Sequence, residues 1–279
     1  MRPPGTRGAT APRKSRWIRL PAGTSIDASQ PDAWIFPVGT RLWKEFRLDG
    51  KKIETRMQWK DSPTHWTLVA YVWSDDQSHA TLASAPSTVP GTSYEIPVGK
   101  CEQCHQAAGD KPLGFSGAML SGAANNGMNV HSLIADGTLQ NLPPEAQKPP
   151  LAAASPVERD AIGYLHANCG LACHKPGGPA PFSLRLSAAN PPQTVQDTDV
   201  WQAINRVSGF TPAGSTEKWY RIRPTDEDHS SIFYRMSSRT PGEQMPPIAS
   251  HVVDEQGRAI LAAWINAMVP PAYPAPAAE

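Results

Sequence analysis

The chain has 279 residues, enough for one large or two ordinary domains with a sizeable hydrophobic core. Its 26 basic and 25 acidic residues give a formal net charge of +1, so no overall field would attract nucleic acid or an anionic membrane. The 30 prolines and 21 glycines, in a chain that is 39% hydrophobic, indicate short elements joined by many turns. No stretch reaches the roughly 18 to 20 apolar residues that span a bilayer, which predicts no integral membrane segment.

Residues 1–16 are predicted to form a disordered N-terminus. They have the basic start of a signal peptide but lack the apolar segment that must follow it. Either the export information lies outside this sequence, or the protein stays inside the cell.

Residues 17–97 have the pattern of a β-rich domain. The stretch RLWKEFRLDGKKIETRMQWK predicts two strands around the turn Asp49-Gly50, and HWTLVAYVW predicts a third strand. Because large aromatic side chains are usually buried, we expect the tryptophans here to form a compact core, with a docking surface as the alternative. They are Trp17, Trp34, Trp43, Trp59, Trp66 and Trp73.

From residue 98 the pattern changes to helices and irregular loops. Residues 98–154 hold the first two cysteines and a proline-broken linker, and residues 155–269 predict a mainly helical domain. Ser155 and Glu158 around Pro156 form a capping box that predicts a helix start. Asp254 caps a last helix, whose apolar stripe runs to Met268. Residues 270–279 predict a disordered, proline-rich tail, so the expected fold class is α+β.

The four cysteines fall in two clusters, each followed at once by a histidine. Cys101 and Cys104 have two residues between them and precede His105, which matches the pattern for covalent attachment of haem c. Two thiols at this spacing reach the two vinyl groups on one edge of the porphyrin, and the next side chain meets the iron. The first cluster therefore predicts a covalent haem with His105 as an iron ligand.

The second cluster has one extra residue between its cysteines. Cys169 and Cys173 are four positions apart, about one helical turn, so both sulfurs can lie on one face before His174. This spacing favours a second haem c site with a longer loop. The alternative is a tetrahedral zinc site built from the cysteines of both clusters, in which a histidine could replace one of them.

A methionine late in the chain favours haem over zinc. Haem iron in electron carriers is commonly bound by histidine on one side and methionine on the other. Met245 lies in a proline-stiffened loop 71 residues after His174, just before the last helix. We expect Met245 to be the second iron ligand at this site.

These features together resemble a class I cytochrome c domain over about residues 155–269. The shared features are a helix running into the haem motif, the loop HKPGGPAPF, the Met-Pro-Pro loop and a closing helix with AAWI. The resemblance implies thioether bonds at Cys169 and Cys173 and iron ligands at His174 and Met245. Other stretches, among them WIFPVGTRLWKEF and GYLHANC, resemble a group of uncharacterised secreted bacterial proteins that carry cytochrome c motifs.

The second iron ligand of the first haem has several candidates. His166 lies on the entry helix, three residues before Cys169, and could point toward the first haem; Met119 is the main alternative. Met128 and His131 are further candidates, and the position could also be open.

Other polar motifs carry little functional signal. The pair Asp226-Glu227 has the pattern of solvated loop charge, and the isolated histidines, His229 among them, are most simply surface residues. The glycines form no phosphate-binding loop of known spacing.

The sequence thus predicts a dihaem c-type cytochrome that carries single electrons between redox partner proteins, without nucleic acid. Haem c is attached after export, so we expect a periplasmic or secreted location. A dihaem peroxidase or oxidase, with one open or displaceable haem position, is the enzyme alternative. The third hypothesis is a zinc-binding or docking subunit of a larger redox complex.

Overall fold

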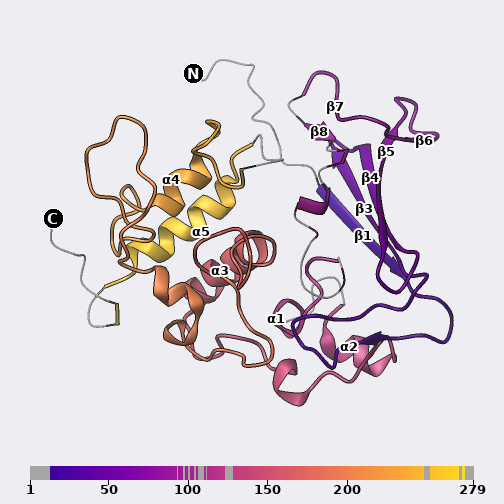
Figure 1. Ribbon diagram of the computed structural model, residues 1–279, viewed down its shortest axis with the longest axis horizontal. Helices are drawn as coiled ribbons and strands as arrows, with labels where there is room; N and C mark the ends of the chain where they lie inside the picture. The colour runs from indigo at the N-terminus through magenta and orange to yellow at the C-terminus, as the bar shows by residue number, and fades with distance from the viewer. Residues whose placement is uncertain are drawn as a thin grey trace. The chain divides into compact units, whose positions relative to one another are not determined.

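A computed structural model describes residues 13–92, 94–96, 98–99, 101–103, 105, 110, 112–122, 128–247, 252–269 and 272–273. The chain divides into two compact units (Figure 1). Unit 1 comprises Met1–Ser25 and Phe36–His105, and unit 2 comprises Ile26–Ile35 and Gln106–Glu279. The fold is mixed, with an antiparallel sheet in the N-terminal half and several helices, as the sequence indicates.

Unit 1 is built on a five-stranded antiparallel sheet in the order β1-β3-β4-β5-β6. Its strands are β1 (Arg13–Arg19), β3 (Arg41–Leu48), β4 (Lys51–Lys60), β5 (Trp66–Trp73) and β6 (Ala80–Leu82). The turn between β3 and β4 is formed by Asp49 (φ 48°) and Gly50 (φ 83°), as a tight hairpin turn requires. The predicted hairpin and third strand are therefore confirmed.

Strand β1 begins earlier than the sequence indicates. Residues 13–16 were expected in the disordered N-terminus, but Arg13 pairs with Arg47 and Arg16 with Lys44. This pairing with β3 supplies backbone hydrogen bonds that local composition does not reveal. Residues 1–12 lie outside the described part of the chain.

The two faces of this sheet differ in burial because side chains alternate along each strand. One face, here called the closed face, holds buried side chains from three strands: Phe46, Glu54, Lys60, Trp66 and Ala70. The other, here called the open face, carries Trp17, Trp43, Trp59, Tyr71 and Trp73, which are half-buried or exposed.

The expected core of six tryptophans is therefore wrong. Trp66 is buried on the closed face, and Trp34 is buried in unit 2. Trp17 is 51% exposed. The strand register decides this outcome, since it directs four of the tryptophans to the open face.

Short elements complete the first half of the chain. Strands β7 (Ser87–Thr88) and β8 (Glu95–Ile96) pair in unit 1. In unit 2, β2 (Ile26–Asp27) pairs in parallel with β9 (Leu139–Gln140). Strand β9 follows α1 (Gly117–Leu120) and α2 (Val130–Ala135) along the chain.

The core of unit 2 forms around α3 (Pro156–Leu165), α4 (Ser231–Ser237) and α5 (Glu255–Asn266). The capping box of Ser155 and Glu158 and the cap by Asp254 are confirmed. Most of the predicted apolar stripe is buried: Leu261, Trp264 and Ile265 on α5 and Met268 just after it are at most 1% exposed. Ile260 of the same stripe is half-buried.

Residue 273 belongs to this core, although a disordered tail was expected from residue 270. Trp264 Nε1 donates to the Tyr273 hydroxyl (3.0 Å), which donates to Glu158 Oε1 (2.6 Å). Burial of this ring and its two hydrogen bonds explain the order at Tyr273. Residues 270–271 and 274–279 lie outside the described part.

Within the described residues, no helix is both long and apolar enough to cross a bilayer.

Candidate haem sites

The second cysteine cluster follows α3 directly, through a π-helical segment at His166–Gly170. The Leu171 amide donates to the His166 carbonyl (2.9 Å), and the His174 amide donates to the Cys169 carbonyl (2.9 Å). Both bonds span five residues, one more than in an α-helix. The extra residue between Cys169 and Cys173 is thus accommodated in a wider turn that still places His174 directly after the loop.

Glycines allow this loop to pack tightly. A Cβ atom on the buried Gly170 would lie 2.6 Å from the Leu184 carbonyl oxygen. A Cβ atom on Gly178 would overlap the Cys173 carbonyl oxygen. The backbone therefore has no room for a larger residue at Gly170, between the two cysteines, or at Gly178, after the second cysteine.

The His174 ring is held in an orientation that suits an iron ligand. Its Nδ1 lies 3.3 Å from the Phe182 carbonyl oxygen, and the two rings lie 4.7 Å apart. When Nδ1–H donates to this carbonyl, the lone pair of Nε2 is left for a metal. Burial lowers the pKa of His174, which favours the neutral form that can bind iron.

Two arginines and the Met245 loop lie in the same region of unit 2. The Arg221 guanidinium lies 4.3 Å from the centroid of the Phe182 ring, and the charges of Arg235 and Arg221 lower the pKa of His174 further. The Met245 amide donates to the carbonyl of Arg235 (2.8 Å). The loop with Met245 is therefore fastened to α4 at a residue whose charge acts on the His174 ring.

The Cys169 thiol of this cluster lies in apolar surroundings. Cys169 packs against the core of unit 2, and burial raises its pKa to about 12. An apolar setting of this kind suits the vinyl edge of a porphyrin. The donor set of Cys169, Cys173 and His174, with its oriented imidazole, thus fits a covalently attached haem.

The first cluster lies in unit 1 against the closed face of the sheet. Cys101 begins a 3-10 turn, and the His105 amide donates to the Cys101 carbonyl (3.1 Å). The Gln58 side-chain nitrogen on β4 lies 3.2 Å from His105 Nδ1. Cys104 lies outside the described residues, so its predicted thioether bond stays a prediction.

An ion pair between the half-buried Arg56 and the buried Glu54 lies beside Cys101. Arg56 Nε and Glu54 Oε1 are 2.6 Å apart, and the Tyr94 hydroxyl donates to Glu54 (2.5 Å). Burial raises the pKa of Cys101, and the charge of Arg56 partly opposes this. The first cluster therefore has a more polar setting than the second.

The two main candidates for the sixth ligand of a haem at the first cluster, Met119 and His166, belong to unit 2, as do the further candidates Met128 and His131. Met119 lies on α1 and is half-buried. His166 is buried, and its Nδ1 accepts a hydrogen bond from the Leu186 amide (2.9 Å). Burial lowers the pKa of His166 to about 4, so the ring is neutral and its proton must be on Nε2. This geometry weighs against His166 as a ligand, because neither nitrogen has a free lone pair.

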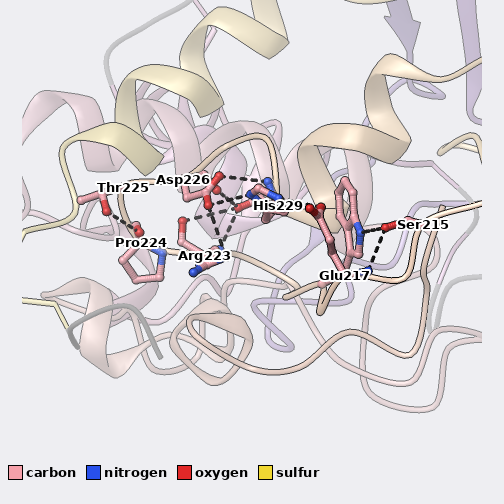
Figure 2. A network of polar contacts seen from close by, with 9 residues as sticks. Ser215, Glu217, Arg223, Pro224, Thr225, Asp226 and His229 are labelled. Carbon is pink, nitrogen blue, oxygen red and sulfur yellow. Dashed lines mark hydrogen bonds and ion pairs between the residues drawn. The ribbon is translucent and has the colours of Figure 1, made fainter. Parts of the chain in front are cut away.

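Sequence reasoning missed a polar network in unit 2 (Figure 2). His229 Nδ1 lies 2.8 Å from Asp226, and His229 Nε2 lies 3.0 Å from Glu217. The Trp219 ring packs against the His229 ring at 5.7 Å. His229 therefore links Asp226 to Glu217, although the sequence indicated that Asp226 and His229 were unrelated surface residues. No local sequence pattern indicated this network, because Glu217 lies 12 residues away from His229 in the chain.

The described residues contain no group of three or more His, Cys, Asp or Glu side chains placed to hold a metal ion. No protein-family model, curated protein or solved structure matches the chain. The functional interpretation therefore depends on the two motifs and on the geometry around them.

Proposed function

We propose that the protein is a dihaem c-type cytochrome that transfers single electrons in an extracytoplasmic redox chain. In this proposal Cys101 and Cys104 hold one haem with His105 on the iron. Cys169 and Cys173 hold the other, with His174 and Met245 as iron ligands. A cytochrome c-like arrangement of residues 155–269 is part of the same proposal.

The orientation of His174 is the observation that carries the proposal. Its Nδ1 faces the Phe182 carbonyl oxygen at 3.3 Å, directly after a cysteine loop packed against an apolar core. A histidine that is merely exposed at the surface would not require a backbone carbonyl to fix its ring. Proteins usually fix a metal-binding imidazole by a hydrogen bond from the ring nitrogen that does not bind the metal, often to a backbone carbonyl.

The chain's own residues would set the properties of the bound group. Haem supplies a one-electron couple between ferrous and ferric iron. Phe182 fixes the tautomer of His174, the apolar side chains beside Cys169 exclude water, and Arg221 and Arg235 place positive charge near the ligand. No substrate needs to bind for this activity.

A dihaem peroxidase or oxidase is the second candidate. The observation that favours it is the state of His166, which weakens one of the two main candidates for the sixth position on the first haem. If Met119 does not bind there either, peroxide could reach that iron. A low-spin ferric spectrum for both haems and slow cyanide binding would support the carrier over the enzyme.

The number of covalent haems tests the proposal most directly. The chain should be produced with the haem-attachment machinery, extracted with acidic acetone and weighed intact. We expect two haems in the wild type and one in each of the double variants Cys101→Ser/Cys104→Ser and Cys169→Ser/Cys173→Ser. Loss of all haem colour on extraction, or stoichiometric zinc in the purified protein, would rule out the proposal.

The role of Met245 can be tested separately. Replacing it with alanine removes the thioether ligand and should change the spin state and potential of one haem while the other keeps its spectrum. Met236→Ala, on α4, is the matched control, since it removes a methionine from the same unit. Unchanged spectra in Met245→Ala would show that this residue does not bind iron.

A further inference from the structure

The near-zero net charge of the chain hides an uneven division between the two units. Unit 1 carries 14 lysines and arginines against 8 acidic residues, a formal charge of +6. Unit 2 carries 12 against 17, a formal charge of −5. The conclusion from composition, that the chain has no field to attract an anionic surface, therefore does not hold for unit 1 taken by itself.

The open face of the unit 1 sheet combines this charge with aromatic rings. The register aligns Trp17, Trp43, Met57 and Val69 in one row across four strands. The described part of the open face buries none of these four side chains fully, and Trp17 is 51% exposed. Trp43, Met57 and Val69 are half-buried, so the row is only partly covered. A partly open apolar row beside an exposed tryptophan indicates an interaction surface.

Cations lie at both ends of this row. Arg13, Arg47 and Lys52 are aligned across β1, β3 and β4 at one end, and Arg19 and Arg41 pair at the other. Among the described residues of these three strands, the only acidic side chain on this face is Glu45, and it is paired with Arg47 (2.7 Å). The open face therefore presents an aromatic centre between two positively charged margins.

We propose that the open face docks onto a membrane surface that contains anionic lipids. Tryptophan and tyrosine favour the headgroup region of a bilayer because their rings are amphipathic, and lysine and arginine are attracted to anionic headgroups. Trp17 and Tyr71 supply the rings, and the two cationic margins supply the charge. The open face would then hold the protein at the membrane surface.

The aromatic rings favour lipid over a stacked ligand. Arg41 lies over the ring of Trp59 at 5.2 Å, and Lys52 lies over the ring of Trp73 at 3.3 Å. Single-stranded nucleic acid binds by stacking bases on open ring faces, and two of the rings here are already covered. A headgroup layer needs only ring edges and charge, and both are available.

Vesicle binding tests this inference and does not require haem. The full chain should cosediment with vesicles made of equal parts phosphatidylglycerol and phosphatidylcholine, with a blue shift in tryptophan emission. It should not bind vesicles of phosphatidylcholine alone. Binding should weaken with added salt, since exposed charges are screened.

Matched variants separate the open face from general charge. Each basic residue near an anionic surface contributes about 1 kcal/mol, so Arg19→Gln/Arg41→Gln should weaken partitioning about 30-fold. Arg206→Gln/Lys218→Gln removes two exposed charges from unit 2 and should leave partitioning close to the wild type. Trp17→Ala should weaken binding and reduce the emission shift.

Equal binding to both kinds of vesicle, no binding, or equal loss in both charge variants would overturn the proposal. A salt-sensitive dimer without vesicle binding would overturn it in favour of a second copy of the chain. Because haem content is measured on the same samples, failure here is distinguishable from failure of the cytochrome proposal.

Discussion

At the scale of single residues, Arg221 offers a test of the proposed second haem site. Its guanidinium is stacked on Phe182, which packs against His174. A positive charge near the iron disfavours the ferric state, so it raises the reduction potential. Arg221→Gln should therefore lower the midpoint potential of one haem in a spectroscopic redox titration, and Arg221→Lys should largely restore it. Unchanged potentials in Arg221→Gln would contradict this placement.

His229 makes the stability of unit 2 depend on pH. Its hydrogen bond with Asp226 raises the pKa of His229, and Glu217 adds to this against the opposing effect of burial. A raised folded-state pKa means that the stabilisation is fully present below the unfolded pKa of about 6.5 and is lost as pH rises through the folded pKa.

The corresponding variant is His229→Gln. We expect it to lower the free energy of unfolding relative to the wild type more at about pH 5 than at about pH 9, in urea titrations at both pH values. His79→Gln, at an exposed position in unit 1, is the control for the loss of a histidine outside this network. If the free energies of unfolding of His229→Gln and the wild type differ equally at both pH values, His229 is not protonated in this network.

At the scale of elements, the contact between α3 and α5 depends on one glycine. A Cβ atom on Gly257 would overlap the ring and hydroxyl of Tyr164, which donates to the capping residue Asp254 (3.0 Å). Gly257→Ala should therefore lower the free energy of unfolding by about 1–3 kcal/mol, although alanine favours helix.

Gly163→Ala is the matched control for this contact. Gly163 also lies in a helix, but its Cβ position has no neighbouring atom within 4 Å. Alanine there should be neutral or stabilising by up to about 1 kcal/mol. Equal effects of the two substitutions in thermal or urea unfolding would show that Gly257 is not a packing constraint.

The cysteine loop shows how much of an element local sequence can predict. The capping box and the spacing of Cys169 and Cys173 predict a helix that enters the loop, and this is confirmed. The widening into a π-helical turn was not predicted. In this turn the carbonyl oxygen of Leu184 lies close to Gly170, and a contact across 14 residues leaves no pattern in the local sequence.

At the scale of the whole molecule, a short early segment is part of unit 2. The carboxylate of Asp32 accepts hydrogen bonds from the Ala188 amide (2.8 Å) and the Ser187 hydroxyl (3.0 Å). Its carbonyl accepts one from Arg185 (2.8 Å). Residues 26–35 therefore contribute to the unit that holds the second cysteine cluster.

Asp32→Ala should destabilise unit 2. It leaves the Ala188 amide and the Ser187 hydroxyl without their partner, which costs about 1–3 kcal/mol where they are buried. Asp75→Ala, at an exposed loop position in unit 1, should change stability by less than about 0.5 kcal/mol. Thermal unfolding of both variants and the wild type measures the difference. If Asp32→Ala has the same midpoint temperature as the wild type, Asp32 does not stabilise unit 2 in this way.

The sequence by itself determined the features that depend on near neighbours. These are the hairpin at Asp49-Gly50, the helix caps at Ser155 and Asp254, and the two cysteine clusters that predict haem. Each is encoded within a few residues, because turn geometry, capping and thioether spacing are local constraints.

Only the tertiary structure decided which side chains lie together across long separations. It placed four tryptophans on an open face, joined Asp32 to Ser187 and Ala188, and set Leu186 against His166. It also divided a nearly neutral chain into a basic unit and an acidic unit. The physical reason is that strand register and core packing depend on contacts between distant segments, and one segment's composition does not specify its partner.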